Sequence, residues 1–178
     1  MGKNTRNTIL ESYKSLLERQ AADQITATAV IKECHIGRST FYYHYRDVYE
    51  LLDDTIRSVF ADCEEAVRSG TWQDVMKTLL YTCRDNKSLV YHIYYSLKRE
   101  HFGRFFNKCL MDAISEHIAG LAKERNTDAQ RTETITEIVS YSAIGYIIHF
   151  LWHDMEDDIE ETAGKLSVVY EELLDRML

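Results

Sequence analysis

The chain has 178 residues, a formal net charge of −8 at pH 7, seven glycines and no proline. Because proline is absent while Leu, Glu, Lys, Arg and Ala are common, this composition lets long helices run unbroken and predicts an all-α fold. The four cysteines form no C-x-x-C pair, which excludes a zinc knuckle and a dithiol redox motif and is typical of reduced thiols in a cytoplasm.

No segment predicts secretion or insertion into a membrane. The N-terminal stretch MGKNTRNTILESYKSLL lacks the unbroken apolar run and the small-residue cleavage site of a secretory signal. The most apolar run, residues 138–152, contains Ser140, Ser142 and His149 and is shorter than the roughly 18 residues that a membrane span needs. We therefore expect a cytoplasmic protein with no membrane partner.

Charge is divided unevenly along the chain. Residues 1–46 hold seven Lys or Arg against four Asp or Glu, a net charge of +3, which leaves −11 for residues 47–178 of a chain whose total is −8. A basic N-terminal piece on an acidic body fits a module that binds a polyanion, joined to a module that binds something else.

Apolar residues at helical spacing predict a first helix over residues 5–22 and a short second helix over 27–34. Thr26 precedes the second helix and can cap its N-terminus. The pattern breaks at residues 35–37, and a third helix over 38–44 follows. Two short helices joined by a tight turn and supported by a preceding helix describe a helix-turn-helix module.

The rest of the chain predicts a larger helical domain over residues 47–178. Residues 47–69 are expected to form one long connecting helix at its start. Further helices are expected over 71–84, 87–97, 102–124, 128–155 and 159–177. The prediction is therefore about nine helices, with the helix-turn-helix domain in residues 1–46. The last two helices are amphipathic, and Ile138 and Val169 are among the apolar residues that they carry.

The stretch ITATAVIKECHIGRSTFYYHYRDVYELL, residues 25–52, resembles the N-terminal module of TetR-type transcriptional regulators. That module reads approximately T-x-x-x-I-A-x-x-A-G-V-S-x-x-T-F-Y-x-H-F-x-x-K-x-x-L. The residues that match in register are Thr26, Val30, Cys34, Ile36, Thr40, Phe41, Tyr42, His44, Tyr45 and Leu51. The form FYYHYRDVYELL is similar to a Firmicutes-type branch that includes regulators and co-regulators near dihydroxyacetone kinase genes. Beyond residue 60 the resemblance is one of helix layout.

The resemblance implies a sequence-specific DNA-binding regulator. It implies an effector-responsive repressor that binds a palindromic, double-stranded operator as a homodimer. Residues 47–178 then become the regulatory and dimerisation domain, whose last two helices pack against their copies as a four-helix bundle. An alternative within the same fold is a co-regulator that acts mainly through a protein partner.

Three positions depart from the family pattern. His35 stands where the family has glycine, so we expect a positive φ there, which histidine adopts more readily than most residues. Gly37 replaces a serine cap, a change that typically costs a few tenths of a kcal/mol. Val48 replaces a lysine that reaches a phosphate in many members, and Arg46 is the nearby substitute.

Four aromatic rings fall within GRSTFYYHY, residues 37–45, and they divide between two faces of the third helix. Phe41 and Tyr45 lie four residues apart, so both are expected to face the core. Tyr42 and Tyr43 fall on the other face, which the resemblance turns toward DNA.

The resemblance also assigns the DNA contacts. Tyr42 is expected on a phosphate, whereas Arg38, Ser39 and Tyr43 project toward base edges, where arginine can donate two hydrogen bonds to guanine. His44 is open between a phosphate contact and an internal hydrogen bond. The candidate DNA-binding residues are Thr26, Thr28, Arg38, Ser39, Thr40, Tyr42, Tyr43, His44 and Arg46.

An aromatic-rich stretch, residues 81–106, has two interpretations. Aromatic rings with a few hydroxyls suit the wall of a pocket for a flat or amphiphilic small-molecule effector. The same rings are equally suited to an ordinary core, and some members of this branch respond to a partner protein instead. The candidate pocket residues are Tyr91, Tyr94, Tyr95, Phe102, Phe105 and Tyr141.

His149 and His153, flanked by Asp154 and Glu156, are spaced to share one face of a helix, as two metal ligands require. No third ligand is recognisable, so we expect no metal and no cofactor, with one imidazole at the dimer seam and the other in solvent. The chain also lacks the G-x-G, G-x-S-x-G and H-E-x-x-H patterns, and we therefore predict that it is not an enzyme.

Overall fold

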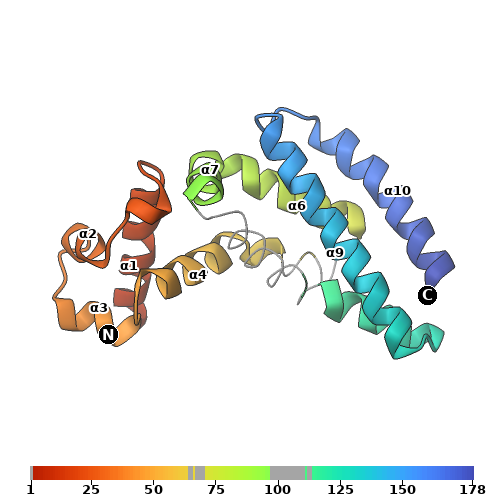
Figure 1. Ribbon diagram of the computed structural model, residues 1–178, viewed down its shortest axis with the longest axis horizontal. Helices are drawn as coiled ribbons and strands as arrows, with labels where there is room; N and C mark the ends of the chain where they lie inside the picture. Colours follow the sequence, from red (N-terminus) through yellow and green to blue (C-terminus); the bar gives the residue numbers. More distant parts are fainter. Residues whose placement is uncertain (1, 64–65, 67–70, 97–110, 112–113) are drawn as a thin grey trace. The chain divides into compact units, whose positions relative to one another are not determined.

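The computed structural model describes residues 2–63, 66, 71–96, 111 and 114–178. Throughout these residues the regular structure is helical, which confirms the predicted all-α fold. The helices, labelled as in Figure 1, are α1 (Gly2–Leu17), α2 (Ala27–Glu33), α3 (Arg38–His44), α4 (Val48–Val59), α6 (Trp72–Asp85), α7 (Lys87–Ser96), α9 (Ala129–Trp152) and α10 (Ile159–Met177). A 3₁₀ turn, Ala22–Gln24, follows α1, and residues 114–125 are also helical.

The helices group into two compact units. The first comprises Met1–Val59 and Asn86–Phe102, so it contains the predicted helix-turn-helix domain together with α4 and α7. The second comprises Phe60–Asp85 and Gly103–Leu178, with α6, α9 and α10.

The predicted single helix over residues 47–69 is wrong, because α4 ends at Val59 and the chain bends at Phe60. Helical structure resumes at residues 61–63. Phe60 and Cys63 are both buried, and the Cys63 thiol lies 3.8 Å from the Thr82 hydroxyl on α6 of the second unit. The bend therefore coincides with the point where the side chains join a different core.

The core of the first unit is built around α1. Its Ile9, Tyr13 and Leu17 have no exposed surface, Val30 of α2 and Leu51 of α4 are also fully buried, and α1 packs against both of these helices. Burial of side chains of this size stabilises the folded state by about 1.5–3 kcal/mol each relative to leaving them exposed. The short helices of the predicted DNA-binding module are thus held by a common apolar centre.

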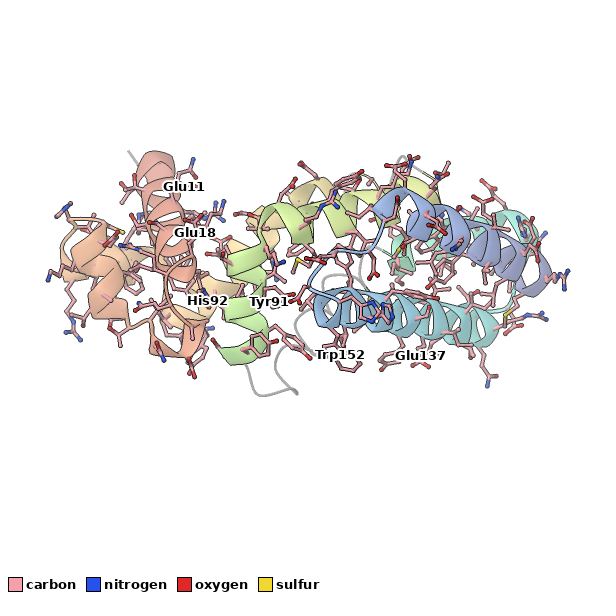
Figure 2. All side chains as sticks on the ribbon, turned by 90° about the horizontal axis from the view of Figure 1, so that it is seen from above. Glu11, Glu18, Tyr91, His92, Glu137 and Trp152 are labelled. Carbon is pink, nitrogen blue, oxygen red and sulfur yellow. The ribbon has the colours of Figure 1, made fainter. Side chains whose placement is uncertain are left out.

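Helix α7 is joined to the end of α1 by two polar contacts. His92 donates from Nδ1 to the Leu17 carbonyl oxygen at 2.5 Å, and the Ala22 amide donates to Ser96 Oγ at 2.7 Å. Figure 2 labels His92 and Tyr91 on this helix. The two contacts satisfy backbone groups near the C-terminal end of α1, which have no partner within that helix.

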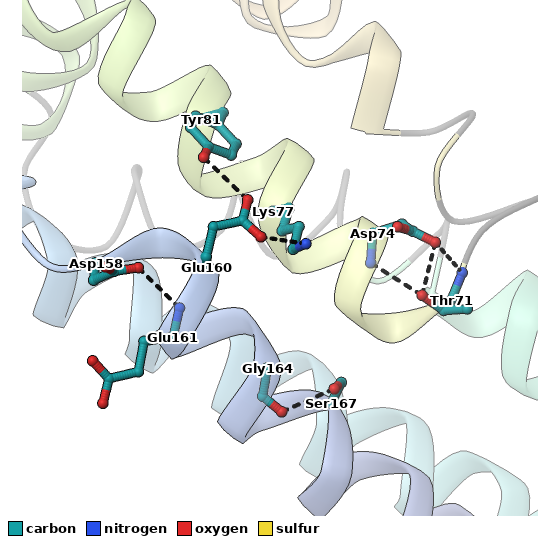
Figure 3. Close-up of polar contacts among 9 residues, drawn as sticks. All are labelled: Thr71, Asp74, Lys77, Tyr81, Asp158, Glu160, Glu161, Gly164 and Ser167. Atoms are coloured by element: carbon teal, nitrogen blue, oxygen red, sulfur yellow. Dashed lines mark hydrogen bonds and ion pairs between the residues drawn. The ribbon is translucent and has the colours of Figure 1, made fainter.

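In the second unit, α6 packs along α10, and a polar clasp joins them (Figure 3). Glu160 forms an ion pair with Lys77 and accepts a hydrogen bond from the Tyr81 hydroxyl at 3.1 Å. The Lys77 hydrogen bond lowers the pKa of the Glu160 carboxyl and raises that of Lys77 itself. Because the carboxyl pKa is lowered on folding, its contribution to stability is present above the ordinary carboxyl pKa and is lost as the pH falls through the folded-state value.

Helix starts in this unit are capped by aspartate. Asp128 accepts from the Arg131 amide before α9, and Asp158 accepts from the Glu161 amide before α10, each at 2.9 Å. Asp74 instead lies within the first turn of α6, where Thr71 donates to it and lowers the pKa of its carboxyl. These contacts fix where the helices begin.

Helices α9 and α10 run antiparallel (Figure 1) and are joined by a hydrogen bond of 2.7 Å between Ser142 Oγ and the Tyr170 hydroxyl. By length and composition α9 is apolar enough to cross a membrane, and half of the stretch that meets this criterion is buried in the fold. Core helices of globular proteins meet the same criterion, so this composition alone is weak evidence for a membrane span.

Candidate nucleic-acid interface

The turn between α2 and α3 has the geometry that its sequence predicts. Thr26 caps α2, because its hydroxyl oxygen accepts from the Ala29 amide at 3.2 Å. Cys34 is buried at the end of α2, and the next residue, His35, has a φ of 54°. The prediction of a positive φ at His35 is confirmed. This residue reverses the chain so that the Ile36 amide donates back to the Ile31 carbonyl oxygen at 3.2 Å.

Removal of the α2 cap has a measurable consequence. Thr26→Ala is expected to lower the free energy of unfolding by about 0.5–2 kcal/mol, because the Ala29 amide loses its acceptor. Urea unfolding measures this change. Thr28→Ala is the control, since Thr28 is exposed inside the same helix and alanine favours helix there. Equal losses of stability in the two variants would contradict the cap assignment.

Gly37 is the N-cap of α3, and its carbonyl oxygen accepts from the Thr40 and Phe41 amides at 3.0 and 3.2 Å. No side-chain hydrogen bond caps this helix, as expected from the replacement of serine by glycine. The φ of Gly37 is −74°, so glycine is not required here by backbone conformation.

The inward face of α3 consists of Phe41 and Tyr45, which are 0% and 4% exposed, and this confirms the predicted division of the rings. The Tyr45 hydroxyl donates to Asp54 of α4, and Asp54 also forms an ion pair with Arg6 of α1. Burial, and then the hydrogen bond to Asp54, raise the pKa of Tyr45. The Asp54 carboxylate therefore connects the end of α3 to both α1 and α4, and it accepts the hydrogen bond that the Tyr45 hydroxyl donates.

The outward face of α3 carries the candidate contacts with DNA. Tyr43 is 82% exposed and Tyr42 is 45% exposed, while Arg38 and Ser39 are also exposed. The Arg38 guanidinium lies 5.4 Å from the centre of the Tyr42 ring, a distance at which the cation is attracted to the ring face. These four exposed side chains share the outward face of α3, and their contacts with DNA stay predictions.

The remaining candidates lie around this face. Thr26 and Thr28 are exposed on α2, whereas Thr40 and His44 are half-buried on α3. The His44 ring packs edge-on against the Tyr43 ring at 5.1 Å. The structure thus brings these candidates together on two neighbouring helices, and their roles toward DNA stay predictions.

Arg46 does not present a free guanidinium. Its side chain forms an ion pair with Glu50 at 3.4 Å, and its amide donates to the same carboxylate at 2.7 Å. An exposed pair of this kind is worth little and can open to reach a phosphate. Tyr49, which the sequence pattern did not single out, is 65% exposed in the first turn of α4 and is a further polar candidate beside Arg46.

The candidate effector residues fall in different places. On α7 the Tyr91 and Tyr95 rings stack at 5.8 Å with an interplanar angle of 15°, and Tyr94 meets Tyr95 edge-on at 5.2 Å. Tyr95 is 73% exposed, and Tyr141 is 58% exposed on α9 of the other unit. Phe102 and Phe105 lie outside the described residues. The assignment of these residues to an effector pocket stays a prediction.

An uncovered apolar face runs along α9 and α10. Ile138 and Val169 are 45% and 62% exposed. The buried stripe of α9 is formed by residues such as Ile135, Val139 and Ile147, so α9 is apolar on two of its sides. The exposed apolar residues on the two helices are Ile138, Tyr141, Tyr146, Trp152, Val168 and Val169.

Known proteins share this arrangement. Residues 70–172 match the TetR-type family described as transcriptional regulator C-terminal region. The chain belongs to the TetR family of transcriptional regulators. A search of curated proteins found no match. Among solved structures, the fold is similar to that of a TetR/AcrR-family transcriptional regulator from Aquifex aeolicus VF5, with 20% identity and a TM-score of 0.62 over 95% of this chain and 99% of that one.

The match to the TetR family and the resemblance of residues 25–52 arise from stretches of the chain that do not overlap. Two separate stretches of the chain therefore point to the same family. The predicted family and the predicted fold are confirmed, and a DNA-binding helix-turn-helix follows from membership of the family. The likeness to the Firmicutes-type branch near dihydroxyacetone kinase genes stays a prediction.

Proposed function

We propose that this TetR-family protein is a cytoplasmic, effector-responsive repressor that binds a palindromic operator as a homodimer, without catalytic activity. The observation that carries the proposal is the two-faced helix α3. Its buried Phe41 and Tyr45 anchor it, while Arg38, Tyr42 and Tyr43 project outward. A helix fixed through one face and polar on the other is suited to enter the major groove of DNA.

The roles of the outward residues follow from their chemistry. Arg38 lies in the first turn of α3, the part of a recognition helix that reaches base edges, and it can donate two hydrogen bonds to guanine O6 and N7. Tyr42 can donate to a phosphate through its hydroxyl, which positions the helix without reading sequence. Tyr43 offers a ring that can pack on a thymine methyl group.

A dimer is proposed through α9 and α10, where the apolar residues remain uncovered. One short recognition helix reads few base pairs, whereas two copies related by symmetry read two half-sites one helical turn apart. The exposed rings of Tyr141 and Trp152 and the exposed Ile138 supply apolar surface that a second copy can bury. An effector, whether a small molecule or a protein partner, would act on the regulatory domain proposed for residues 47–178.

Two substitutions on α3 test the division between positioning and reading. Tyr42→Phe is expected to weaken binding to all DNA sites together, by about 0.5–3 kcal/mol, because it removes one hydrogen bond to a charged acceptor. Arg38→Ala is expected to weaken operator binding by about 1–3 kcal/mol and to reduce the preference over random DNA. Fluorescence anisotropy with operator and scrambled duplexes at one salt concentration measures both effects.

The operator itself is found by genome-wide recovery of bound DNA with the wild-type protein. Both variants alter exposed side chains, so a melting curve should match that of the wild type and serves as the control. If Arg38→Ala weakened operator and random DNA by the same factor, Arg38 would be a phosphate contact. Failure of the wild type to bind any DNA would instead favour the alternative of a co-regulator that acts through a protein partner.

A further inference from the structure

Two histidines and one aspartate gather where α9 turns back toward α10. Asp154 and Met155 have φ values of 54° and 58°, so two successive residues adopt the left-handed conformation and reverse the chain. The Met155 amide donates to the Phe150 carbonyl oxygen at 2.8 Å, and the Met155 side chain is only 2% exposed. This anchored reversal brings Asp157 back to the last turns of α9, beside His149 and His153.

The three side chains are close enough to share one ion. Asp157 Oδ1 lies 3.2 Å from Nδ1 of His153, and its Oδ2 lies 3.7 Å from Nδ1 of His149. One ligand atom from each residue lies within 4.8 Å of the other two. On a tetrahedral zinc ion, with ligands about 2.0–2.2 Å from the metal, two ligand atoms are about 3.3–3.6 Å apart. The observed separations thus bracket the spacing that zinc requires.

We propose that His149, His153 and Asp157 form a binding site for a divalent transition metal of the zinc class. Two imidazoles and one carboxylate suit zinc, whereas calcium and magnesium prefer oxygen ligands alone. The two imidazoles are about half exposed and Asp157 is 30% exposed, which leaves room for water or a further ligand in the fourth position. The proposal is independent of DNA binding, since these residues all lie in the second unit.

The location gives the metal a structural consequence. His149 and His153 belong to α9, whereas Asp157 precedes the Asp158 cap of α10, so one ion would fasten the turn between the two helices. His149 and Asp157 also line a hollow of about 190 Å³, together with Tyr146, Phe150 and other residues of α6, α9 and α10. A bound metal would therefore lie at the edge of this hollow.

The alternative for the same geometry is an ion pair that forms whenever a histidine is protonated. An exposed ion pair is not selective for metals, whereas a site with three ligands loses affinity when any one of them is removed. Substitution of each ligand in turn, with the metal as the probe, distinguishes these two cases.

The test is calorimetric titration of the untagged, full-length chain with Zn²⁺, and with Co²⁺ followed by visible absorption. We expect one ion per chain, and we expect His149→Gln, His153→Gln and Asp157→Asn each to lower the affinity at least about tenfold, since loss of even an outer-shell partner typically costs 10–100-fold. Glu156→Gln is the matched control, because it removes an equal charge from the exposed residue next to Asp157 and should leave affinity unchanged. Absence of Zn²⁺ binding, or equal affinity in all four variants, would overturn the proposal.

Discussion

Phe41→Ala is expected to destabilise the first unit by about 3–5 kcal/mol, the usual result of removing a buried phenyl ring. Phe41 has no exposed surface and contacts the Tyr42 and Tyr45 rings at centroid distances of 5.3 and 6.1 Å. The cavity would lie beneath the recognition helix, so α3 would lose its fixed orientation together with its stability. Urea unfolding followed by circular dichroism measures the change.

The matched control is Tyr43→Ala, which removes a ring of similar size from the opposite face of α3. Tyr43 is 82% exposed, so the free energy of unfolding should change by no more than about 0.5 kcal/mol. Operator binding should nevertheless weaken, because the lost ring belongs to the face of α3 that is proposed to contact base edges. A stability loss in Tyr43→Ala as large as that in Phe41→Ala would show that the two faces of α3 have been assigned wrongly.

The features that the sequence predicted correctly are those that local interactions determine. The cap at Thr26 needs only the Ala29 amide three residues later. The positive φ at His35 was predicted because His35 stands at a turn position where the family has glycine. The division of Phe41 and Tyr45 from Tyr42 and Tyr43 follows from a repeat of 3.6 residues. Each depends on neighbours within a few residues, which a sequence displays directly.

The features that were missed lie where the chain turns, at Phe60 and at residues 154–155. The bend at Phe60 was missed because residues 47–69 are all compatible with helix, and the pattern does not show that Phe60 and Cys63 are buried in the second unit. Asp157 was missed as a companion of His149 and His153 because the predicted helix ended at residue 155, whereas two consecutive left-handed residues bring Asp157 back beside the two histidines. Aspartate and methionine at positions 154 and 155 predict a left-handed conformation less strongly than glycine would.

The sequence pattern groups Ile138 with Ile135 and Val139 as apolar residues of one helix, although Ile138 is exposed and the other two are buried. Only one side of a helix with two apolar sides can meet the chain's own core. The exposed apolar side of α9 indicates a surface that a partner can cover. A sequence pattern alone does not tell which of the two apolar sides is buried in the chain's own core. Roles of the DNA-facing and effector residues stay predictions because they depend on ligands.

Gly145→Glu is expected to convert the proposed dimer to monomers at micromolar concentration. Gly145 is exposed on α9, and on the same side at helical spacing lie Ile138, Tyr141 and Trp152. No atom of the described residues outside the helix's own turns lies within 4 Å of the position that a Cβ would take, so the monomer accommodates a side chain there. A glutamate would, however, place a charge in the middle of an apolar seam, where it loses its water without gaining a partner.

The matched control is Gly120→Glu. Gly120 is also helical and exposed, and a Cβ added to it would likewise meet no neighbouring atom within 4 Å among the described residues, yet it lies outside the apolar face of α9 and α10. Both substitutions replace a helical glycine by a better helix former. The free energy of unfolding of the chain should therefore stay the same or rise by about 0.5 kcal/mol in both variants. Any difference between them therefore reports the interface and not the fold.

Light scattering should give the mass of one chain for Gly145→Glu and of two chains for the wild type and Gly120→Glu. Operator affinity should fall about 100-fold or more in Gly145→Glu alone, because a monomer loses the gain from binding two linked half-sites. The wild-type outward face of α3 is unchanged in this variant, so binding to a single half-site should persist. A Gly145→Glu protein that remained a dimer and kept its operator affinity would place the dimer interface elsewhere than on α9.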